Sequence, residues 1–274
     1  MVLGDDKALL LGRRTPIVDQ YTPSILYPIP RDTARQNLGL TAALPFGGID
    51  FWHAYELSWL DASGKPVVRV GRFSVPATSP NIVESKSFKL YLNSLNNSCF
   101  ASDEQARDTI ISDVSGVAGE LVCLTLYAVD DPALAGTILS GDCLDESPIT
   151  LKSAEPDASQ IDLYAGEVAE EILYSHLLRS LCPVTGQPDW ATVWLHYRGT
   201  AIIHGSLLRY IVGYREHKEF HEQCVERMFV DIAARCDVEF LHIQAFYTRR
   251  GGLDISPFRS TDVDAQPLPR LNRQ

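Results

Sequence analysis

Alternating apolar and polar positions predict a β-hairpin near the start of the chain, followed by two helices. The hairpin is rich in β-branched and aromatic residues, and the turn-forming sequence Asp-Ala-Ser-Gly separates its strands. The first helix places Phe88, Leu92 and Leu95 on one face, and Ser102 can cap the second. The expected elements are strands over 53–60 and 66–75, helices over 84–96 and 103–117, and a buried strand over 121–129.

The second half of the chain repeats this order of elements. Tyr210 lies 119 positions after Tyr91, and Asp231 lies 118 positions after Asp113. These matches, together with the order of elements, indicate a duplicated β-β-α-α-β unit. The expected elements of this half are strands over 171–178 and 191–197, helices over 204–214 and 220–235, and a strand over 238–247.

Residues 145–162 are the best candidate for a linker between the two halves. The segment is acidic, contains Pro148 and Pro156, and lacks clear periodicity. We therefore expect an N-terminal module over 1–150 and a C-terminal module over 160–274.

Composition and charge restrict the possible partners. The 274 residues are 45% hydrophobic and 22% charged, which is typical of a globular protein, and the net charge is −11. A nucleic-acid-binding protein usually carries a basic face, whereas the one dense basic run here is short, at 248–250. No stretch approaches the ~20 apolar residues of a membrane span, and the apolar run 9–11 is too short for a signal peptide. We expect a cytoplasmic protein that binds neither nucleic acid nor membrane.

Several common motifs are absent from the sequence. No two glycines are separated by a single residue, so GxGxxG is impossible, and neither GxxxxGK[ST] nor HExxH occurs. A dinucleotide would therefore not be held in a classical Rossmann crevice. His217 and His221 could present two metal ligands on one helical face. We favour the interpretation that they flank the start of a helix, because no third ligand has convincing spacing.

The segment from Cys182 to Asp189 carries the strongest chemical signal. Proline after Cys182 disfavours helical backbone, and a further proline and a glycine shape a fixed loop that ends at a carboxylate. A cysteine acts as a nucleophile in its thiolate form, and a nearby acid–base group can manage its proton. The alternative is a buried structural cysteine in a turn. The other five cysteines are interpreted as structural, with Cys123 inside an apolar strand and Cys143 in a loop without acid–base groups nearby beyond ordinary acidic residues.

A second segment begins at Glu84, at the expected start of a helix, where a carboxylate suits the helix dipole. Lys86 and Lys89 share a helix face and could clamp a phosphate, or they could form a solvated basic edge.

Two further segments suggest ligand binding. The Glu222 carboxylate, next to His221, could accept two parallel hydrogen bonds from a guanine-like base, although a helix-start glutamate is the simpler interpretation. Paired arginines before Gly251 and Gly252 could cradle a phosphate, or could form a polar β-turn.

Together these segments resemble the long, two-module form of the 7-cyano-7-deazaguanine reductase family, the nitrile reductases of queuosine biosynthesis in the tRNA modification pathway. The resemblance rests on four motifs: Glu84-Ser-Lys-Ser-Phe-Lys-Leu-Tyr, Cys182-Pro-Val-Thr-Gly-Gln-Pro-Asp189, His221-Glu222 and Arg249-Arg250-Gly-Gly. It implies an α+β fold of two tandem tunnelling-fold (T-fold) modules, each an antiparallel sheet backed by two helices. It also implies a homodimer.

The resemblance further implies an NADPH-dependent reduction of 7-cyano-7-deazaguanine (preQ0) to the aminomethyl form (preQ1). In this mechanism Cys182 forms a thioimide with the nitrile carbon, Asp189 transfers the thiol proton, and His221 is a second proton donor. Two NADPH are used per turnover, and no metal is required. The implied substrate-binding residues are Val83, Glu84, Ser85, His221 and Glu222, and the implied cofactor-binding residues are Ser85, Lys86, Arg250 and Gly251.

Three alternatives remain open at this point. A zinc-dependent pterin or GTP cyclohydrolase of the same fold would need metal ligands that the Cys and His spacing does not supply. A non-catalytic purine-binding module would not need Cys182. A thiol nitrilase would start from the same thioimide and use water, whereas the basic segments favour a cofactor.

Overall fold

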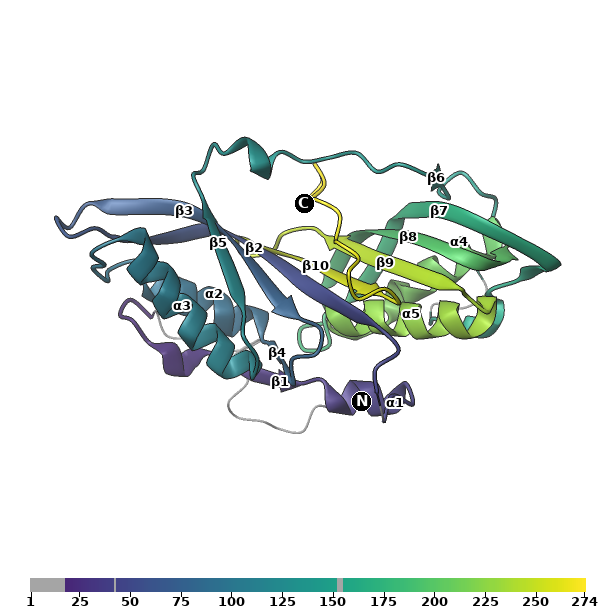
Figure 1. Ribbon diagram of the computed structural model, residues 1–274, viewed down its shortest axis with the longest axis horizontal. Helices are drawn as coiled ribbons and strands as arrows, with labels where there is room; N and C mark the ends of the chain where they lie inside the picture. The colour runs from purple at the N-terminus through teal and green to yellow at the C-terminus, as the bar shows by residue number, and fades with distance from the viewer. Residues whose placement is uncertain (1–17, 42, 152–154) are drawn as a thin grey trace. The chain divides into compact units, whose positions relative to one another are not determined.

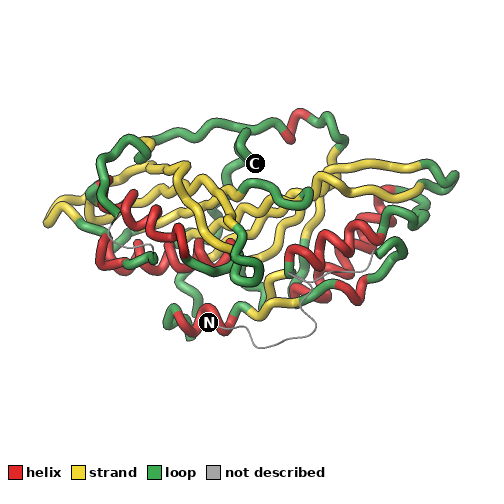
Figure 2. The backbone as a smooth tube through the Cα atoms, turned by 180° about the vertical axis from the view of Figure 1, so that it is seen from behind, coloured by secondary structure: helices red, strands yellow, loops and turns green. Residues whose placement is uncertain are grey.

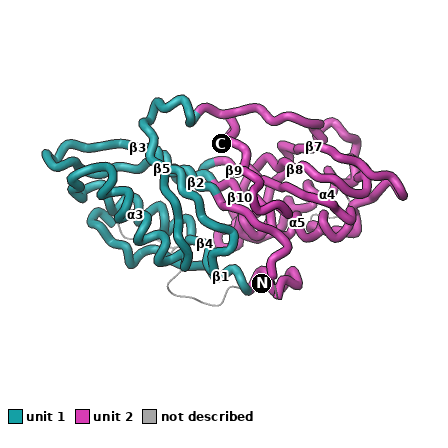
Figure 3. The backbone as a smooth tube through the Cα atoms, viewed as in Figure 1, with its two compact units in different colours: residues 1–32, 51–134, 249–254 teal, residues 33–50, 135–248, 255–274 magenta. Residues whose placement is uncertain are grey.

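The computed structural model describes residues 18–41, 43–151 and 155–274. The chain forms two compact units (Figure 3). Unit 1 takes in residues 1–32, 51–134 and 249–254, and unit 2 takes in 33–50, 135–248 and 255–274. The apolar run 9–11, used above to argue against a signal peptide, lies outside the described residues. Within the described part of the chain, no helix has the length and apolar character needed to cross a membrane.

Unit 1 is built on the predicted hairpin. Its three main strands pair in the order β5-β3-β2, and β1 and β4 form a separate antiparallel pair. Phe88 of α2 packs edge-on against Trp52 of β2 and Phe73 of β3, at centroid distances of 5.5 and 4.9 Å. The elements are η1 (Pro23–Ile25), β1 (Pro28–Pro30), β2 (Gly47–Leu60), β3 (Pro66–Pro76), β4 (Asn81–Val83), α2 (Ser85–Ser94), α3 (Asp103–Ala118), β5 (Cys123–Tyr127) and η2 (Pro132–Leu134); the first residues of β2 belong to unit 2.

Unit 2 contains longer strands, which pair in the order β10-β9-β8-β7-β6. Strand β6 runs parallel to β7, and the pairs β7–β8, β8–β9 and β9–β10 are antiparallel. In each unit the two main helices lie side by side on one face of the strands (Figures 1 and 2). The elements are α1 (Asp32–Asn37), β6 (Asp142–Cys143), η3 (Ala158–Gln160), β7 (Leu163–Leu181), β8 (Pro188–Ile202), α4 (His204–Val212), η4 (Gly213–Glu216), α5 (His221–Cys236), β9 (Phe240–Tyr247) and β10 (Leu253–Ser260).

Each half contains an equivalent hydrogen bond between its two main helices, in addition to the common order of elements. Tyr91 on α2 donates to Asp113 on α3 at 2.7 Å, and Tyr210 on α4 donates to Asp231 on α5 at 2.6 Å. Each bond joins the two helices of its half through the residues that the sequence matches. The predicted β-β-α-α-β order and the α+β class, with antiparallel strands backed by two helices, are confirmed. The module boundaries at 150 and 160 stay a prediction.

Three sequence-based expectations were wrong. Strand β5 is not buried: among the described strands it lies at the end of the sheet beside β3, and Leu121 and Val129 next to it are 69% and 61% exposed. Cys123, the first residue of β5, is exposed rather than internal. Cys143 lies in a short strand, β6, and has acid–base neighbours, described below.

Strand β10 was not predicted at all. All eight of its residues are buried, including Asp254 and Arg259. In unit 2, Arg259 pairs with Asp50 at 2.7 Å and with Glu226 at 2.9 Å, and Glu226 also pairs with Arg35 at 2.8 Å. Buried charges are tolerated when they are paired and hydrogen-bonded, so these ion pairs allow a charged segment to form an internal strand.

Candidate active site

The loop at Cys182 closes the β7–β8 hairpin of unit 2. Cys182 N donates to Gln187 O, and Gly186 N donates to Cys182 O, both at 2.9 Å. Gly186 has a φ of +66°, in the left-handed region that favours glycine. The loop is therefore fixed by its own backbone, and the Cys182 side chain is buried, at 6% exposure.

Asp189 lies on β8, beside this loop. It pairs in the strand ladder with Ser180, one ladder step from the pairing of Leu181 with Pro188. Because residues two apart on a strand point to the same face, the ladder directs Cys182 and Asp189 to one side of the hairpin. Asp189 is 4% exposed.

His221 completes this group from the first position of α5. Its Nε2 lies 3.3 Å from Asp189 Oδ2. The backbone explains the position, because Leu181 N donates to His217 O at 2.8 Å and ties the residues before α5 to the end of β7. No hydrogen-bond partner reaches the buried Nδ1 of His221 among the described residues. A carboxylate that holds one ring nitrogen leaves the other to exchange a proton with a ligand.

Tyr247, on β9, supports the imidazole from the side. The Tyr247 and His221 rings are stacked, with centroids 3.8 Å apart and planes 12° apart. Burial raises the pKa of Tyr247 well above its usual range, so the phenol stays neutral. Tyr247 is not among the residues that the sequence predicts for the site, because nothing in the sequence brings β9 to the start of α5.

Glu222 follows His221 in the first turn of α5 and is only 2% exposed. Its neighbour Cys224 is fully buried, and burial raises the pKa of that thiol far above the usual range. The interpretation of Cys224 and Cys236 as structural thiols agrees with their burial.

In unit 1, Glu84 is the N-cap of α2. Its two carboxylate oxygens accept hydrogen bonds from the backbone N–H groups of Lys86 and Ser87, at 2.9 and 2.7 Å. Burial raises the pKa of Glu84 above its ordinary value, against the lowering effect of these N–H groups. Val83 ends β4 and pairs with Pro28, while Ser85 begins the helix. These bonds establish the capping role, and the Glu84 side chain is fully buried, so its role in substrate binding stays a prediction.

The glycines after Arg250 form a tight hairpin turn in unit 1. Arg250 N donates to Leu253 O at 2.9 Å, and Gly251 and Gly252 have φ values of +59° and +80°. A Cβ on Gly251 would lie 2.9 Å from Lys89 Cδ, so the turn packs closely against α2. A cavity of about 90 Å³ lies here, lined by Glu56, Lys89, Asn93, Asn96 and both glycines, among others.

This turn brings together two segments that were predicted to hold a cofactor. Lys89 on α2 lies against Gly251, and Lys86 lies one helical turn earlier on the same face. The Arg249 guanidinium stacks on the Tyr55 ring, 3.8 Å from its centroid. Cationic side chains beside glycine N–H groups fit the phosphates of a dinucleotide. The sequence did not point to Tyr55, because Arg249, which stacks on it, is almost two hundred positions away.

The zinc alternative at His217 and His221 finds no support among the described residues. His217 follows η4 and pairs with Glu155 and Glu219, at 2.9 and 3.0 Å, whereas His221 begins α5 and faces Asp189. The prediction that the two histidines flank a helix start is confirmed.

Comparison with known proteins settles the family. A family model described as nitrile reductase, 7-cyano-7-deazaguanine-reductase N-terminal, matches residues 17–126, and a model described as QueF-like protein matches residues 188–266. The NADPH-dependent 7-cyano-7-deazaguanine reductase of Dechloromonas aromatica is 54% identical over 94% of this chain and 92% of its own. The chain belongs to the 7-cyano-7-deazaguanine reductase family. The protein of that name from Chromohalobacter salexigens is 49% identical over 96% of both chains.

Three of the four motifs lie wholly within the residues that the family models match, whereas Cys182 lies outside both matches. Both halves of this chain match family models, one on each side of the Cys182 loop, and the second match begins at the first residue of β8. A solved structure, apo archaeosine synthase QueF-Like, covers 38% of this chain with a TM-score of 0.31 and 13% identity, a likeness too remote to bear on the fold.

Proposed function

We propose that this protein reduces the nitrile of 7-cyano-7-deazaguanine to the primary amine, 7-aminomethyl-7-deazaguanine, through a thioimide on Cys182. The observation that carries the proposal is the pair of buried Asp189 and half-buried His221 beside the rigid Cys182 loop. The names of the relatives from Dechloromonas aromatica and Chromohalobacter salexigens support the substrate and the dependence on NADPH.

The first step makes one bond and moves one proton. The Cys182 sulfur attacks the nitrile carbon, and Asp189 carries the thiol proton to the nitrile nitrogen, so that a neutral thioimide forms. Burial of Cys182 and Asp189, at 6% and 4% exposure, keeps water from the thioimide and disfavours hydrolysis to an acid.

Two NADPH, used in turn, would supply two hydrides to the substrate carbon, four electrons in all. Between the two hydride transfers, Cys182 leaves as a thiolate and an imine remains. His221 gives a proton to the nitrogen as the amine forms, with Asp189 holding its Nε2 at 3.3 Å. The proton donor is then Nδ1, the nitrogen opposite Asp189.

The remaining predicted residues bind the two ligands. Glu84 and Glu222 would accept hydrogen bonds from the N–H groups of the base, and Val83 and Ser85 would line its pocket. Lys86 and Arg250 would pair with cofactor phosphates, helped by the N–H of Gly251, which fits the tight turn against α2. No metal enters any of these steps, and a homodimer is the expected assembly.

The test mixes purified protein with 7-cyano-7-deazaguanine and follows NADPH absorbance, with Cys182→Ala alongside. We expect the wild type to consume two NADPH per base. Cys182→Ala should lose this activity, and Cys123→Ala, a control at an exposed cysteine, should retain it. Asp189→Asn should bind the base and slow turnover by about 10²–10⁴-fold.

Other outcomes favour other functions. An adduct on Cys182 without NADPH consumption would indicate a thiol nitrilase. Tight base binding with neither adduct nor consumption would indicate a binding module, and activity that depends on zinc would indicate a cyclohydrolase.

A further inference from the structure

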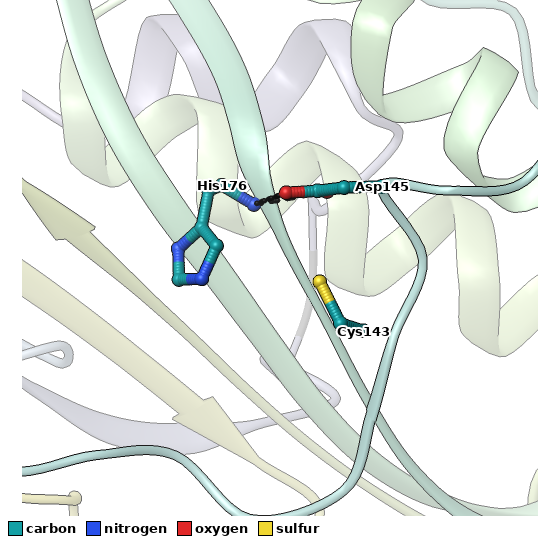
Figure 4. A group of neighbouring side chains, drawn as sticks. All are labelled: Cys143, Asp145 and His176. Carbon is teal, nitrogen blue, oxygen red and sulfur yellow. Dashed lines mark hydrogen bonds between the residues drawn. The ribbon is translucent and has the colours of Figure 1, made fainter.

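Three potential metal ligands of different chemical types meet in unit 2, where β6 and the turn after it run beside β7. Cys143, Asp145 and His176 each offer one ligand atom, and these atoms all lie within 4.8 Å of one another (Figure 4). Cys143 and His176 are exposed, and Asp145 is half-buried. None of them belongs to the candidate active site or to the reaction proposed above.

The fold brings these residues together through an irregularity in β7. Asp142 and Cys143 of β6 pair in parallel with Leu173 and Tyr174. Immediately afterwards, the pairing of β7 with β8 shifts register between Ser175 and Leu178. A bulge of this kind changes the direction in which a side chain points, and His176 lies inside it.

The Asp145 carboxylate is held by several hydrogen bonds, and the His176 ring makes one. Asp145 Oδ1 accepts from Ser175 Oγ at 2.7 Å, and both of its oxygens accept from His176 N at 3.2 Å. His176 Nδ1 lies 2.9 Å from Thr192 Oγ1. In protein metal sites, a ligating imidazole usually bonds a second group through its other nitrogen. The hydrogen bonds of Asp145 to the bulge explain why a carboxylate lies here. They do not explain why the Cys143 thiol and the His176 imidazole lie beside it.

We propose that Cys143, Asp145 and His176 bind one Zn²⁺ ion, with His176 Nε2 as the imidazole ligand and water in the fourth position. Thiolate, imidazole and carboxylate are the usual zinc ligands, whereas Mg²⁺ and Ca²⁺ take oxygen ligands. Binding releases the Cys143 thiol proton to solvent, and the thiolate and carboxylate then neutralise the two charges of the ion.

The geometry needs only a small adjustment. Ligand atoms around tetrahedral zinc lie about 3.5 Å apart, so atoms within 4.8 Å must close by roughly 1 Å, which rotation of the exposed Cys143 and His176 side chains can supply. The bound ion would attach the segment 142–145 to β7. It would not touch the nitrile chemistry, so activity should not depend on it.

The experiment uses the full-length, tag-free protein, stripped of metal with EDTA and titrated with Co²⁺ and then Zn²⁺. Co²⁺ bound by a thiolate absorbs in the near-ultraviolet, which reports the sulfur ligand directly. Cys182→Ala removes the proposed catalytic thiol, and Cys123→Ser is a matched control at another exposed cysteine. We expect one Co²⁺ per chain in the wild type and in both of these variants, displaced by Zn²⁺.

Cys143→Ser should lose the thiolate absorption, and His176→Gln should weaken binding at least tenfold, while both keep the wild-type rate of NADPH oxidation. As a second readout, one equivalent of Zn²⁺ should protect Cys143, but not Cys99, from alkylation in the wild type. Thiolate absorption that persists in Cys143→Ser, or wild-type protein that neither binds stoichiometric Co²⁺ nor shows this protection, would overturn the proposal.

Discussion

The imidazole of His221 lies flat against the phenol ring of Tyr247, with centroids 3.8 Å apart, while its Nε2 faces Asp189. One residue therefore fixes the plane of the ring and the other fixes its rotation. An imidazole held in this way is oriented before a substrate arrives, and such orientation favours the acid–base role proposed for His221.

Tyr247→Leu should lower kcat more than it raises KM, because it removes the stack on the proposed proton donor His221 and leaves Glu84 and Glu222 unchanged. Removing such support typically costs about 10–100-fold in rate. Tyr247→Phe keeps the ring and should stay within about threefold of the wild type. Steady-state kinetics of NADPH oxidation measure both, and equal losses in the two variants would assign the effect to the hydroxyl instead of the stack.

Glu84 should make the folded protein less stable as pH rises, because its pKa is raised; a carboxylate with a lowered pKa has the opposite effect. Burial raises its pKa above the ordinary 4.5, so the folded protein binds this proton more tightly than the unfolded chain. Its contribution to the free energy of unfolding is therefore complete below pH 4.5 and decreases as pH rises through the higher, folded-state pKa.

Glu84→Gln isolates this effect. The variant also loses part of the α2 cap, a cost of about 1 kcal/mol. The wild-type advantage in the free energy of unfolding should shrink as pH rises from 4 towards neutrality, as measured by urea denaturation. An advantage that grows over this range would mean that the helix N–H groups outweigh burial.

The buried ion pairs around Glu226 predict a large loss on removing that one carboxylate. Glu226 pairs with Arg35 and Arg259, so Glu226→Gln leaves two buried guanidinium groups with less compensating charge. The expected loss is about 3–5 kcal/mol. Glu239→Gln, at an exposed pair with Arg198, should cost less than about 1 kcal/mol. Denaturant unfolding compares the two, and similar losses would contradict the prediction.

The six thiols should divide into two classes of reactivity. Cys99, Cys123 and Cys143 are exposed, whereas the other three cysteines are buried. Burial raises the pKa of Cys236 to about 12, which disfavours its reactive thiolate. A thiol reagent at neutral pH should modify three groups quickly in the native protein and all six after denaturation. Rapid modification of Cys224 or Cys236 would show that α5 opens easily.

The sequence by itself determined the main elements of each half and their order, although not β10 or the short elements. Helix α3 and its Ser102 cap, the β2–β3 hairpin and the duplication all follow from local periodicity, because a helix or a hairpin depends on residues close in sequence. Cys182, Asp189 and His221 could also be named as candidates, because their motifs lie on short segments, and their chemical roles stay a prediction.

Only the tertiary structure decided which distant residues became neighbours. Strand β10 carries buried charges that look like a surface segment until Asp50 and Glu226 are placed beside Arg259. A bulge in β7 places His176 near Cys143, and the pairing of β9 with β8 places Tyr247 near His221. Such contacts depend on the register and packing of whole elements, and no local pattern of hydrophobic and polar residues encodes these.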